Sequence, residues 1–238
     1  MDNSIYATLT RQSGLMREMQ LVANNIANLS TTGFRKEGIV FSEFVEKLGD
    51  DAPSLSMAGA RGRLTNQTQG VLTQTGGQFD FGIEGEGFFL IETPDGQALT
   101  RAGSFTPSAE GELVTPDGHR LLDGGGAPVF VPPDARAISL SADGTLSADG
   151  TPLTQIGLWL PGAPEDLTRR DGVMFTLSAP AEPVLEATVL QGFLEGSNVN
   201  PVSEIARMIQ VQRAYEMGQG FLDKEDQRIR NVLNTLGR

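Results

Sequence analysis

The chain has 238 residues, of which 39% are hydrophobic, with 18 basic and 30 acidic side chains and a net charge of -12. We expect so acidic a chain not to bind nucleic acid, because phosphate binding requires clustered Lys and Arg. The absence of cysteine and the presence of only one histidine exclude disulfides, thiolate zinc sites, cysteine nucleophiles and poly-histidine metal sites.

Charged residues and glycines are unevenly distributed, so the two ends of the chain differ in composition from its middle. Residues 1–37 carry four basic and three acidic groups, residues 195–238 carry six of each, and the middle carries eight and 21, a net charge of -13. Of the 29 glycines, 23 lie in residues 38–194. No stretch reaches the roughly 18 consecutive apolar residues of a membrane span, and the start lacks the basic and apolar blocks of a signal peptide. We therefore expect no direct membrane insertion and no cleaved signal peptide.

The first predicted element is a helix from Ile5 to Leu29. Its apolar residues recur at alternating spacings of four and three, with Gln12 in one vacant position, which is the pattern of a heptad seam. Leu15 and Val22 belong to a flanking row, so the apolar stripe is wider than one partner helix needs. At about 1.5 Å per residue the helix is roughly 40 Å long. The seam consists of Ile5, Leu9, Met16, Met19, Ala23 and Ile26.

The middle of the chain is predicted to be an antiparallel β domain. Residues 38–70 read as an irregular connector with a short apolar beginning. From residue 71 to 194, short β-branched or aromatic runs alternate with turn dipeptides. An Asp-Gly pair favours a type I′ hairpin because both residues accept positive φ. Four such pairs occur, namely Asp95-Gly96, Asp117-Gly118, Asp143-Gly144 and Asp149-Gly150.

The last predicted element is a second long helix. Asn200 and Pro201 supply its cap and first-turn proline, and Glu204 lies near its positive end. Gly218 and Gly220 weaken its middle by about 1 kcal/mol each, so we expect its order to depend on packing partners. A second seam repeats every seventh residue, through Met208, Tyr215, Leu222, Ile229 and Leu236.

These elements predict an α+β fold in which the terminal helices pair in a coiled-coil-like axial domain and the β domain is inserted between them. The two terminal helices could pack against each other within a monomer, or they could pack against other chains. The width of the apolar stripe and the low charge of the ends favour other chains. The expected domains are residues 1–37, 38–70, 71–194 and 195–238.

Candidate chemical groups are few. Residues 82–87 only partly resemble a dinucleotide-binding loop and lead into a strand, and residues 143–149 lack the spacing and closing Glu of a calcium loop. His119 follows a predicted turn and is expected to be solvated. Carboxylate pairs that could do acid–base work are expected by chance in so acidic a domain, namely Glu84 with Glu86 and Glu110 with Glu112. We expect no enzyme activity, no cofactor and no metal.

Three blocks of sequence are more specific than these patterns. The first is Ala-Asn-Asn-Ile-Ala-Asn-Leu-Ser-Thr-Thr-Gly-Phe-Arg at residues 23–35. The second covers residues 69–76, 79–89 and 100–105, and the third covers residues 194–200 and 208–216. In this order they resemble the flagellar basal-body rod and hook protein family over nearly the whole chain. The chain departs from the family at Gly82, where an alanine is usual, and at Leu99, where a tyrosine is frequent.

The resemblance implies a structural subunit of the flagellar rod. The opening residues 2–6 and the short length resemble the proximal-rod members, with a distal-rod paralogue as the alternative. The subunit would be exported through the flagellar type III apparatus and would assemble helically with itself and other rod proteins. The product would be a hollow shaft that crosses the periplasm and transmits torque. In that picture the terminal helices form layers around the channel and the acidic β domain faces outward.

The resemblance and the seams together give the residues expected to mediate assembly. Three asparagines on nearly one helix face could satisfy polar groups between subunits without burying charge, or could simply end the helix. The full set is Ile5, Leu9, Met16, Met19, Ala23, Asn24, Asn25, Ile26, Asn28, Gly33, Phe34, Leu194, Glu195, Ser197, Asn198, Met208, Tyr215, Leu222, Ile229 and Leu236.

Two other functions compete with this one. A non-flagellar binding module oligomerised by helical ends would need clustered exposed aromatic residues, yet the chain has one tryptophan, Trp159, and two tyrosines. A hydrolase would use one of the carboxylate pairs, and loss of turnover in Glu84→Gln would support it.

Overall fold

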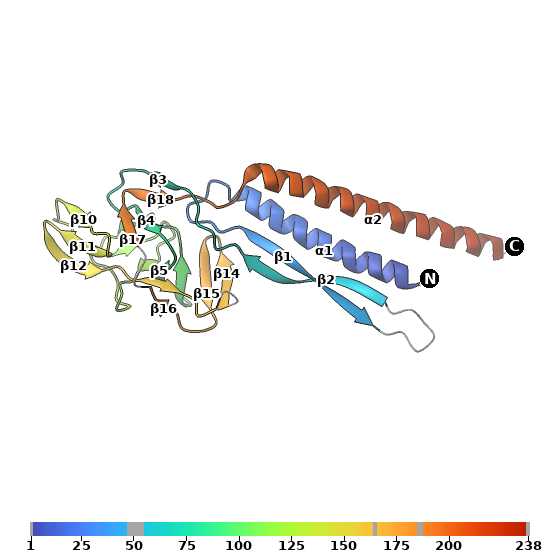
Figure 1. Ribbon diagram of the computed structural model, residues 1–238, viewed down its shortest axis with the longest axis horizontal. Coiled ribbons are helices and arrows are strands. Elements are labelled where there is room, and N and C mark those ends of the chain that lie inside the picture. Colours follow the sequence, from blue (N-terminus) through green and yellow to red (C-terminus); the bar gives the residue numbers. More distant parts are fainter. Residues whose placement is uncertain (1, 47–54, 164–165, 185–187, 237–238) are drawn as a thin grey trace. The chain divides into compact units, whose positions relative to one another are not determined.

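The computed structural model describes residues 2–46, 55–163, 166–184 and 188–236 of the chain. They form two compact units. The helical unit comprises Met1–Ala27, Glu37–Asn66 and Asn200–Arg238, and the β unit comprises Asn28–Lys36 and Gln67–Val199. Two helices and many antiparallel strands make the fold α+β, as predicted (Figure 1).

Within the described ranges, neither helix is long and apolar enough to span a membrane.

The two helices are α1, Asp2–Ala27, and α2, Pro201–Leu236. Helix α1 ends two residues before the predicted Leu29, because a turn follows in which Thr31 N donates to Asn28 O at 3.3 Å. The cap of α2 is as predicted, since Ser203 N donates to Asn200 Oδ1 at 3.1 Å. A side-chain acceptor at this position satisfies one of the N–H groups that a helix start leaves unpaired.

The sequence suggested an irregular connector at residues 38–70, but residues 38–46 and 55–65 form regular strands, while residues 47–54 lie outside the described ranges. Strands β1, Glu37–Glu46, and β2, Leu55–Thr65, form an antiparallel hairpin in which Glu37 lies opposite Thr65. A register shift between Val40 and Phe41 marks a bulge. The second strand is rich in small residues and lacks strong β-formers, so its pairing partner decides its conformation more than its own propensity does. The predicted domain limits stay a prediction.

In the helical unit, α1 and α2 lie side by side and the β1–β2 hairpin runs along α1 (Figure 1). The helices are antiparallel, since Gln12 contacts Tyr215 while Asn25 contacts Glu204. Leu15 and Val22 of α1 are buried. The unit is therefore a layer of two helices covered on one side by a two-stranded ribbon.

The β unit is built from short antiparallel strands. Its largest sheet runs β14-β15-β6-β5-β9-β8-β7, with β13 paired to β5 and β16 paired to β13. Smaller sheets pair β10-β11-β12, β17-β4 and β18-β3. The strands are β3 Leu72–Gln74, β4 Phe81–Glu84, β5 Phe88–Thr93, β6 Gly96–Thr100, β7 Thr106–Pro107, β8 Leu113–Val114, β9 Arg120–Leu121, β10 Ile138–Leu140, β11 Thr145–Ala148, β12 Thr151–Gln155, β13 Leu158–Leu160, β14 Leu167–Asp171, β15 Met174–Leu177, β16 Glu182–Pro183, β17 Thr188–Gln191 and β18 Phe193–Glu195.

All four Asp-Gly pairs lie between consecutive strands, but only one has the expected turn geometry. Asp149 has φ 49° and is the only non-glycine residue with positive φ in the part of the chain that the structure describes. At the other three turns only the glycine has positive φ. Asp143 Oδ1 instead accepts a hydrogen bond from Thr145 N at 3.0 Å. The aspartate side chain thus stabilises the turn, and the glycine alone supplies the left-handed residue.

The β unit encloses two apolar clusters. In the larger one, Phe105 contacts Phe81 and Phe89, with ring centroids 5.8 and 5.5 Å apart. In the smaller one, Phe88 and Phe175 meet edge to face at 5.8 Å. Because fully burying such a side chain contributes about 1.5–3 kcal/mol, this unit holds an ample core of its own.

Candidate functional site

Polar contacts set the register of α1 against α2. Gln12 Nε2 donates to Tyr215 O at 2.9 Å, and Arg207 Nε donates to Glu18 Oε1 at 2.5 Å. Glu18 is buried although it is charged. Truncating Arg207 would therefore leave a buried carboxylate without its cation, which is costly.

Asn25 joins three elements of the helical unit. Its Nδ2 donates to Glu37 O at 2.8 Å and to Glu204 Oε2 at 3.1 Å, and its Oδ1 accepts from Glu37 N at 3.0 Å. The side chain is buried and nearly all of its hydrogen-bonding capacity is used within one chain. Asn24 is exposed, and Asn28 lies in the turn after α1. The three asparagines therefore have three different surroundings.

The predicted seam of α1 is the more exposed side of the helix. Leu9, Met16 and Ala23 are exposed, while Ile5, Met19 and Ile26 are half-buried. The flanking row is buried instead, at Leu15 and Val22. One chain therefore covers only part of the wide apolar stripe.

The apolar seam of α2 continues beyond α1. At about 1.5 Å per residue, α2 with 36 residues is ~54 Å long and α1 with 26 residues is ~39 Å. Extending the register from Gln12 and Tyr215, the first residue of α1 falls opposite about residue 225 of α2. In this part of α2 four apolar side chains are exposed, namely Ile229, Val232, Leu233 and Leu236. The half-buried members of the seam, Met208, Tyr215 and Leu222, all precede it.

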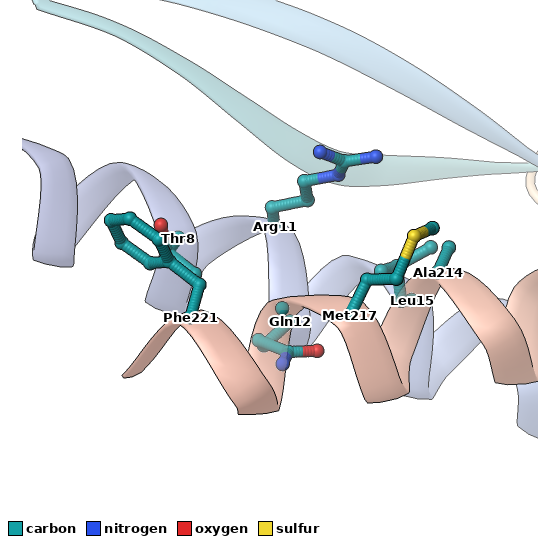
Figure 2. Close-up of a pocket in the computed structure, with 8 residues that line it drawn as sticks. Thr8, Arg11, Gln12, Leu15, Ala214, Met217 and Phe221 are labelled. Atoms are coloured by element: carbon teal, nitrogen blue, oxygen red, sulfur yellow. The ribbon is translucent and has the colours of Figure 1, made fainter. Parts of the chain in front are cut away.

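A pocket of about 320 Å³ opens between the two helices. Figure 2 shows side chains of both helices around it. Gly218 belongs to its wall, and a Cβ at that position would lie 2.7 Å from Gln12 Nε2. The glycine therefore allows Gln12 to reach the backbone of α2. The remaining lining residues are Thr8, Arg11, Leu15, Ala214, Met217 and Phe221.

A buried charge cluster lies inside the β unit. Glu195 Oε1 is 2.8 Å from Arg35 Nη1, and Glu195 Oε2 is 3.0 Å from Arg101 Nη1. The side chains are 1–3% exposed. Gly70 N also donates to Glu195 Oε1 at 2.8 Å. Burial lowers the pKa of Arg101 to about 10 and lowers that of Arg35, while the Glu195 carboxylate opposes both shifts. A single carboxylate therefore holds two desolvated guanidinium groups.

The segment after α1 is locked into the same unit. Gly33 N donates to Glu195 O at 2.7 Å, and Asn198 Oδ1 accepts from Lys36 N at 2.6 Å. Phe34 is buried beneath the guanidinium of Arg169, whose Cζ lies 4.5 Å from the ring centroid. These side chains shape the single chain, and their part in contacts between chains stays a prediction.

Two further predicted assembly residues, Leu194 and Ser197, also lie in this unit. Leu194 pairs with Thr73 across β18 and β3, and Ser197 Oγ accepts from Val199 N at 3.3 Å.

The carboxylates considered for acid–base work have structural partners. Glu84 Oε2 accepts from Thr188 Oγ1 at 3.2 Å, and Glu112 Oε2 lies 2.7 Å from Arg120 Nε. Glu110 accepts from Ser108, and Glu86 is exposed. His119 follows the turn between β8 and β9. Residues 82–87 join two strands, so no helix N-terminus is present there to bind phosphate.

Sequence reasoning missed the residues that complete these contacts. Arg35 and Arg101 were seen only as parts of the family blocks, and Gln12 only as a gap in a seam. An arginine in each of two separate blocks, with a glutamate in the third, was the available signal for the charge cluster. Because Arg207 carries no signal in its own neighbourhood, its contact with Glu18 required the fold.

Comparisons with known proteins match the same three blocks. Residues 5–35 match the family described as flagella basal body rod protein, and residues 82–148 match the flagellar hook protein FlgE/F/G D1 domain. Residues 190–236 match the flagellar basal body rod FlgEFG protein C-terminal family. The matches cover both helices and much of the β unit.

Relatives match along the whole chain. The flagellar basal-body rod protein FlgF of Caulobacter vibrioides is 37% identical, in an alignment covering 100% of this chain and 99% of that protein. FlgF of Mesorhizobium japonicum is 35% identical over 100% of this chain and 99% of that protein. The flagellar basal-body rod protein FlgG of Bacillus subtilis is 28% identical over 97% of this chain and 98% of that protein.

Proposed function

The chain belongs to the flagellar basal-body rod protein family as a structural subunit of the rod, and we propose that it assembles there through the apolar faces its terminal helices leave exposed. The observation that carries this proposal is the seam of α2, which continues past the start of α1. Leu222, Ile229 and Leu236 are seven residues apart and share one face of the helix. A helix of another chain would cover this face where α1 no longer does.

The energetics favour such a contact. Each fully buried Leu, Ile or Val contributes about 1.5–3 kcal/mol, so four exposed side chains form a substantial interface. The nearby charges are already paired within α2, since Arg228 contacts Glu225 and Arg230 contacts Asp226. A partner helix could therefore pack against the apolar row without having to neutralise these charges. The resulting arrangement would be coiled-coil-like.

The finer role rests on the resemblance. The FlgF relatives support a proximal-rod position, and the match to FlgG relatives keeps a distal-rod position as the alternative. We place the subunit in the shaft across the periplasm, in contact with its own copies and other rod proteins, after export through the type III apparatus. The helices would line the channel, and the β unit, which carries 18 acidic and seven basic residues, would stay solvated.

The family is structural, and we propose that this chain likewise transmits torque without catalysing a reaction. The contacts of Glu84 and Glu112 in the β unit support this reading, because carboxylates engaged in turns and ion pairs are poorly placed for proton transfer.

Ile229→Asp tests the assembly surface. The charge would be placed on a face that we expect to be buried between chains, where desolvation is costly, so the variant should fail to restore motility to a strain that lacks the native protein. Gln227→Asp is the matched control, because residue 227 is exposed on the same turns but about 200° around the helix. Normal motility in Ile229→Asp would contradict the proposal.

A further inference from the structure

The pocket between α1 and α2 has the size and surface of a socket for one aromatic side chain. Its volume of about 320 Å³ exceeds the ~150 Å³ of a cavity that holds a benzene ring. Leu15, Ala214, Met217 and Phe221 give it apolar walls drawn from both helices (Figure 2). Arg11 also lines it, and a guanidinium attracts the face of an aromatic ring while it repels a second cation.

The socket also contains an unsatisfied hydrogen-bond acceptor. Gln12 is 7% exposed, and its Nε2 must face Tyr215 O because a carbonyl only accepts hydrogen bonds. Its Oε1 consequently has no partner among the residues that the structure describes. The last torsion of a glutamine is soft, so a small rotation of the amide can turn Oε1 toward an incoming donor. The fitting occupant has an apolar ring and a neutral donor at its tip.

Tyr6 is such a side chain. It is 60% exposed, whereas the other tyrosine, Tyr215, and the single tryptophan, Trp159, are both half-buried. Nine residues, or two and a half helical turns, separate Tyr6 from Leu15, so the two side chains leave α1 on opposite sides. The ring of Tyr6 therefore points away from the pocket of its own chain.

Building on the assembly proposed above, we propose that Tyr6 of one copy inserts into the α1–α2 pocket of a second copy and donates its hydroxyl to Gln12 Oε1. The ring and the pocket lie on opposite sides of α1, so each copy can give one contact and receive another. Such head-to-tail contacts generate rings when the rotation closes and open helical assemblies when it does not. A helical rod is the product of the second case.

Photo-crosslinking from position 6 tests this contact directly. A photoreactive phenylalanine analogue replaces Tyr6 in the full chain, and the products in isolated rods are mapped by mass spectrometry. We expect a covalent dimer linked from position 6 to residues 8–15 or 214–221 of another copy. A dimer linked to any other segment, or rods with no dimer, would overturn the socket. Either result leaves the test of Ile229→Asp untouched, so the two proposals fail independently.

A second test of the proposed contact fills the pocket with a larger side chain. Ala214→Phe occupies the socket from inside and should reduce the dimer at least tenfold, whereas Ala206→Phe, at an exposed position of α2 outside the pocket, should not. Equal dimer yields from the two variants would contradict the proposal.

The hydroxyl is tested by Tyr6→Phe, which leaves an exposed side chain and the fold unchanged. It should weaken association about 2- to 10-fold, as expected for one lost hydrogen bond, and have no further effect in a Gln12→Leu background. An undiminished effect in that background would show that the hydroxyl does not bind Gln12.

Discussion

The two units of the molecule satisfy their apolar side chains in different ways. Among the residues whose exposure is described, which leave out 2–4, 42–46 and 55–61 of the helical unit, 28 apolar residues are buried, 24 in the β unit and four in the helical unit. Of the 17 exposed large apolar residues there, 15 lie in the helical unit. The β unit therefore buries most of its large apolar side chains within the single chain. The helical unit leaves many of its large apolar side chains exposed, where other chains can contact them. Exposed apolar area of this kind marks an interaction site.

Both units also bury polar side chains. In the β unit a single carboxylate, Glu195, binds two arginines at depth. In the helical unit, Gln12 keeps a buried oxygen without a partner among the described residues. Buried nitrogens of Arg35, Arg101 and Trp159 in the β unit also lack a hydrogen-bond partner among the described residues, so the contrast between the units rests on their apolar side chains. For Gln12 we infer that the missing partner comes from another chain.

Glu195→Gln should break the β unit. It removes the only carboxylate within salt-bridge distance of Arg35 and Arg101 among the described residues, and breaking a buried ion pair costs about 3–5 kcal/mol. Urea unfolding followed by Trp159 fluorescence measures the loss. The control is Glu92→Gln, whose pair with Arg120 is about half exposed and should contribute at most ~1 kcal/mol. Equal losses would mean that the buried cluster does not hold the unit together.

Gly33→Ala should have the next largest effect on the same unit. Gly33 has φ +70°, and an added Cβ would lie 2.3 Å from Ala102 N, a backbone atom that cannot easily move. Gly118→Ala has a similar φ of +85° but nothing within 4 Å of its Cβ, so it carries only the left-handed strain of about 1–2 kcal/mol.

The difference in unfolding free energy between these two alanine variants measures the cost of the steric clash between the added Cβ at residue 33 and Ala102 N. We expect Gly33→Ala to lose about 1–3 kcal/mol more than Gly118→Ala, the usual cost of overpacking. If the two variants were equally stable, residues 28–36 would not be locked into the β unit as described.

Gly218→Ala and Gly220→Ala should have the smallest effects and opposite signs. Alanine favours an exposed helix over glycine by about 1 kcal/mol, and a Cβ at Gly220 meets nothing within 4 Å. At Gly218 the Cβ would displace Gln12, which costs the hydrogen bond to Tyr215. Thermal unfolding monitored by helical circular dichroism should show Gly220→Ala stabilised and Gly218→Ala not. A stabilised Gly218→Ala would mean that Gln12 contributes nothing to the helix pair.

Local patterns predicted the elements better than the contacts between them. The heptad spacing and the Asn200-Pro201 pair located both helices, and the Asp-Gly pairs located four turns. Strand β2 was missed because its small residues carry little strand propensity, and β1, although rich in Ile, Val and Phe, was read as part of an irregular connector. The register pairs residues that are distant in the sequence, such as Glu37 with Thr65, and no local window contains both.

Some features of the candidate site could be predicted from the sequence, and others could not. The seam of α2 followed from its seven-residue repeat. The width of the apolar stripe on α1 was also predicted, but not that the chain itself buries Leu15 and Val22 while Leu9 and Met16 stay exposed. Periodicity gives the width of an apolar stripe, but not which part of it the chain itself covers. The polar partners, such as Arg207 for Glu18, lie about 190 residues apart and could be found only from the fold.

Hydrogen exchange of the amides in residues 226–236 tests the central claim most directly. The measurement compares dilute monomer with assembled rods, using the amides of β5 as the internal standard. We predict rapid exchange of this segment in the monomer, slow exchange in the rod, and slow exchange of β5 in both. If residues 226–236 were as protected in the monomer as β5, or gained no protection on assembly, the last turns of α2 would not be a surface that awaits a neighbour.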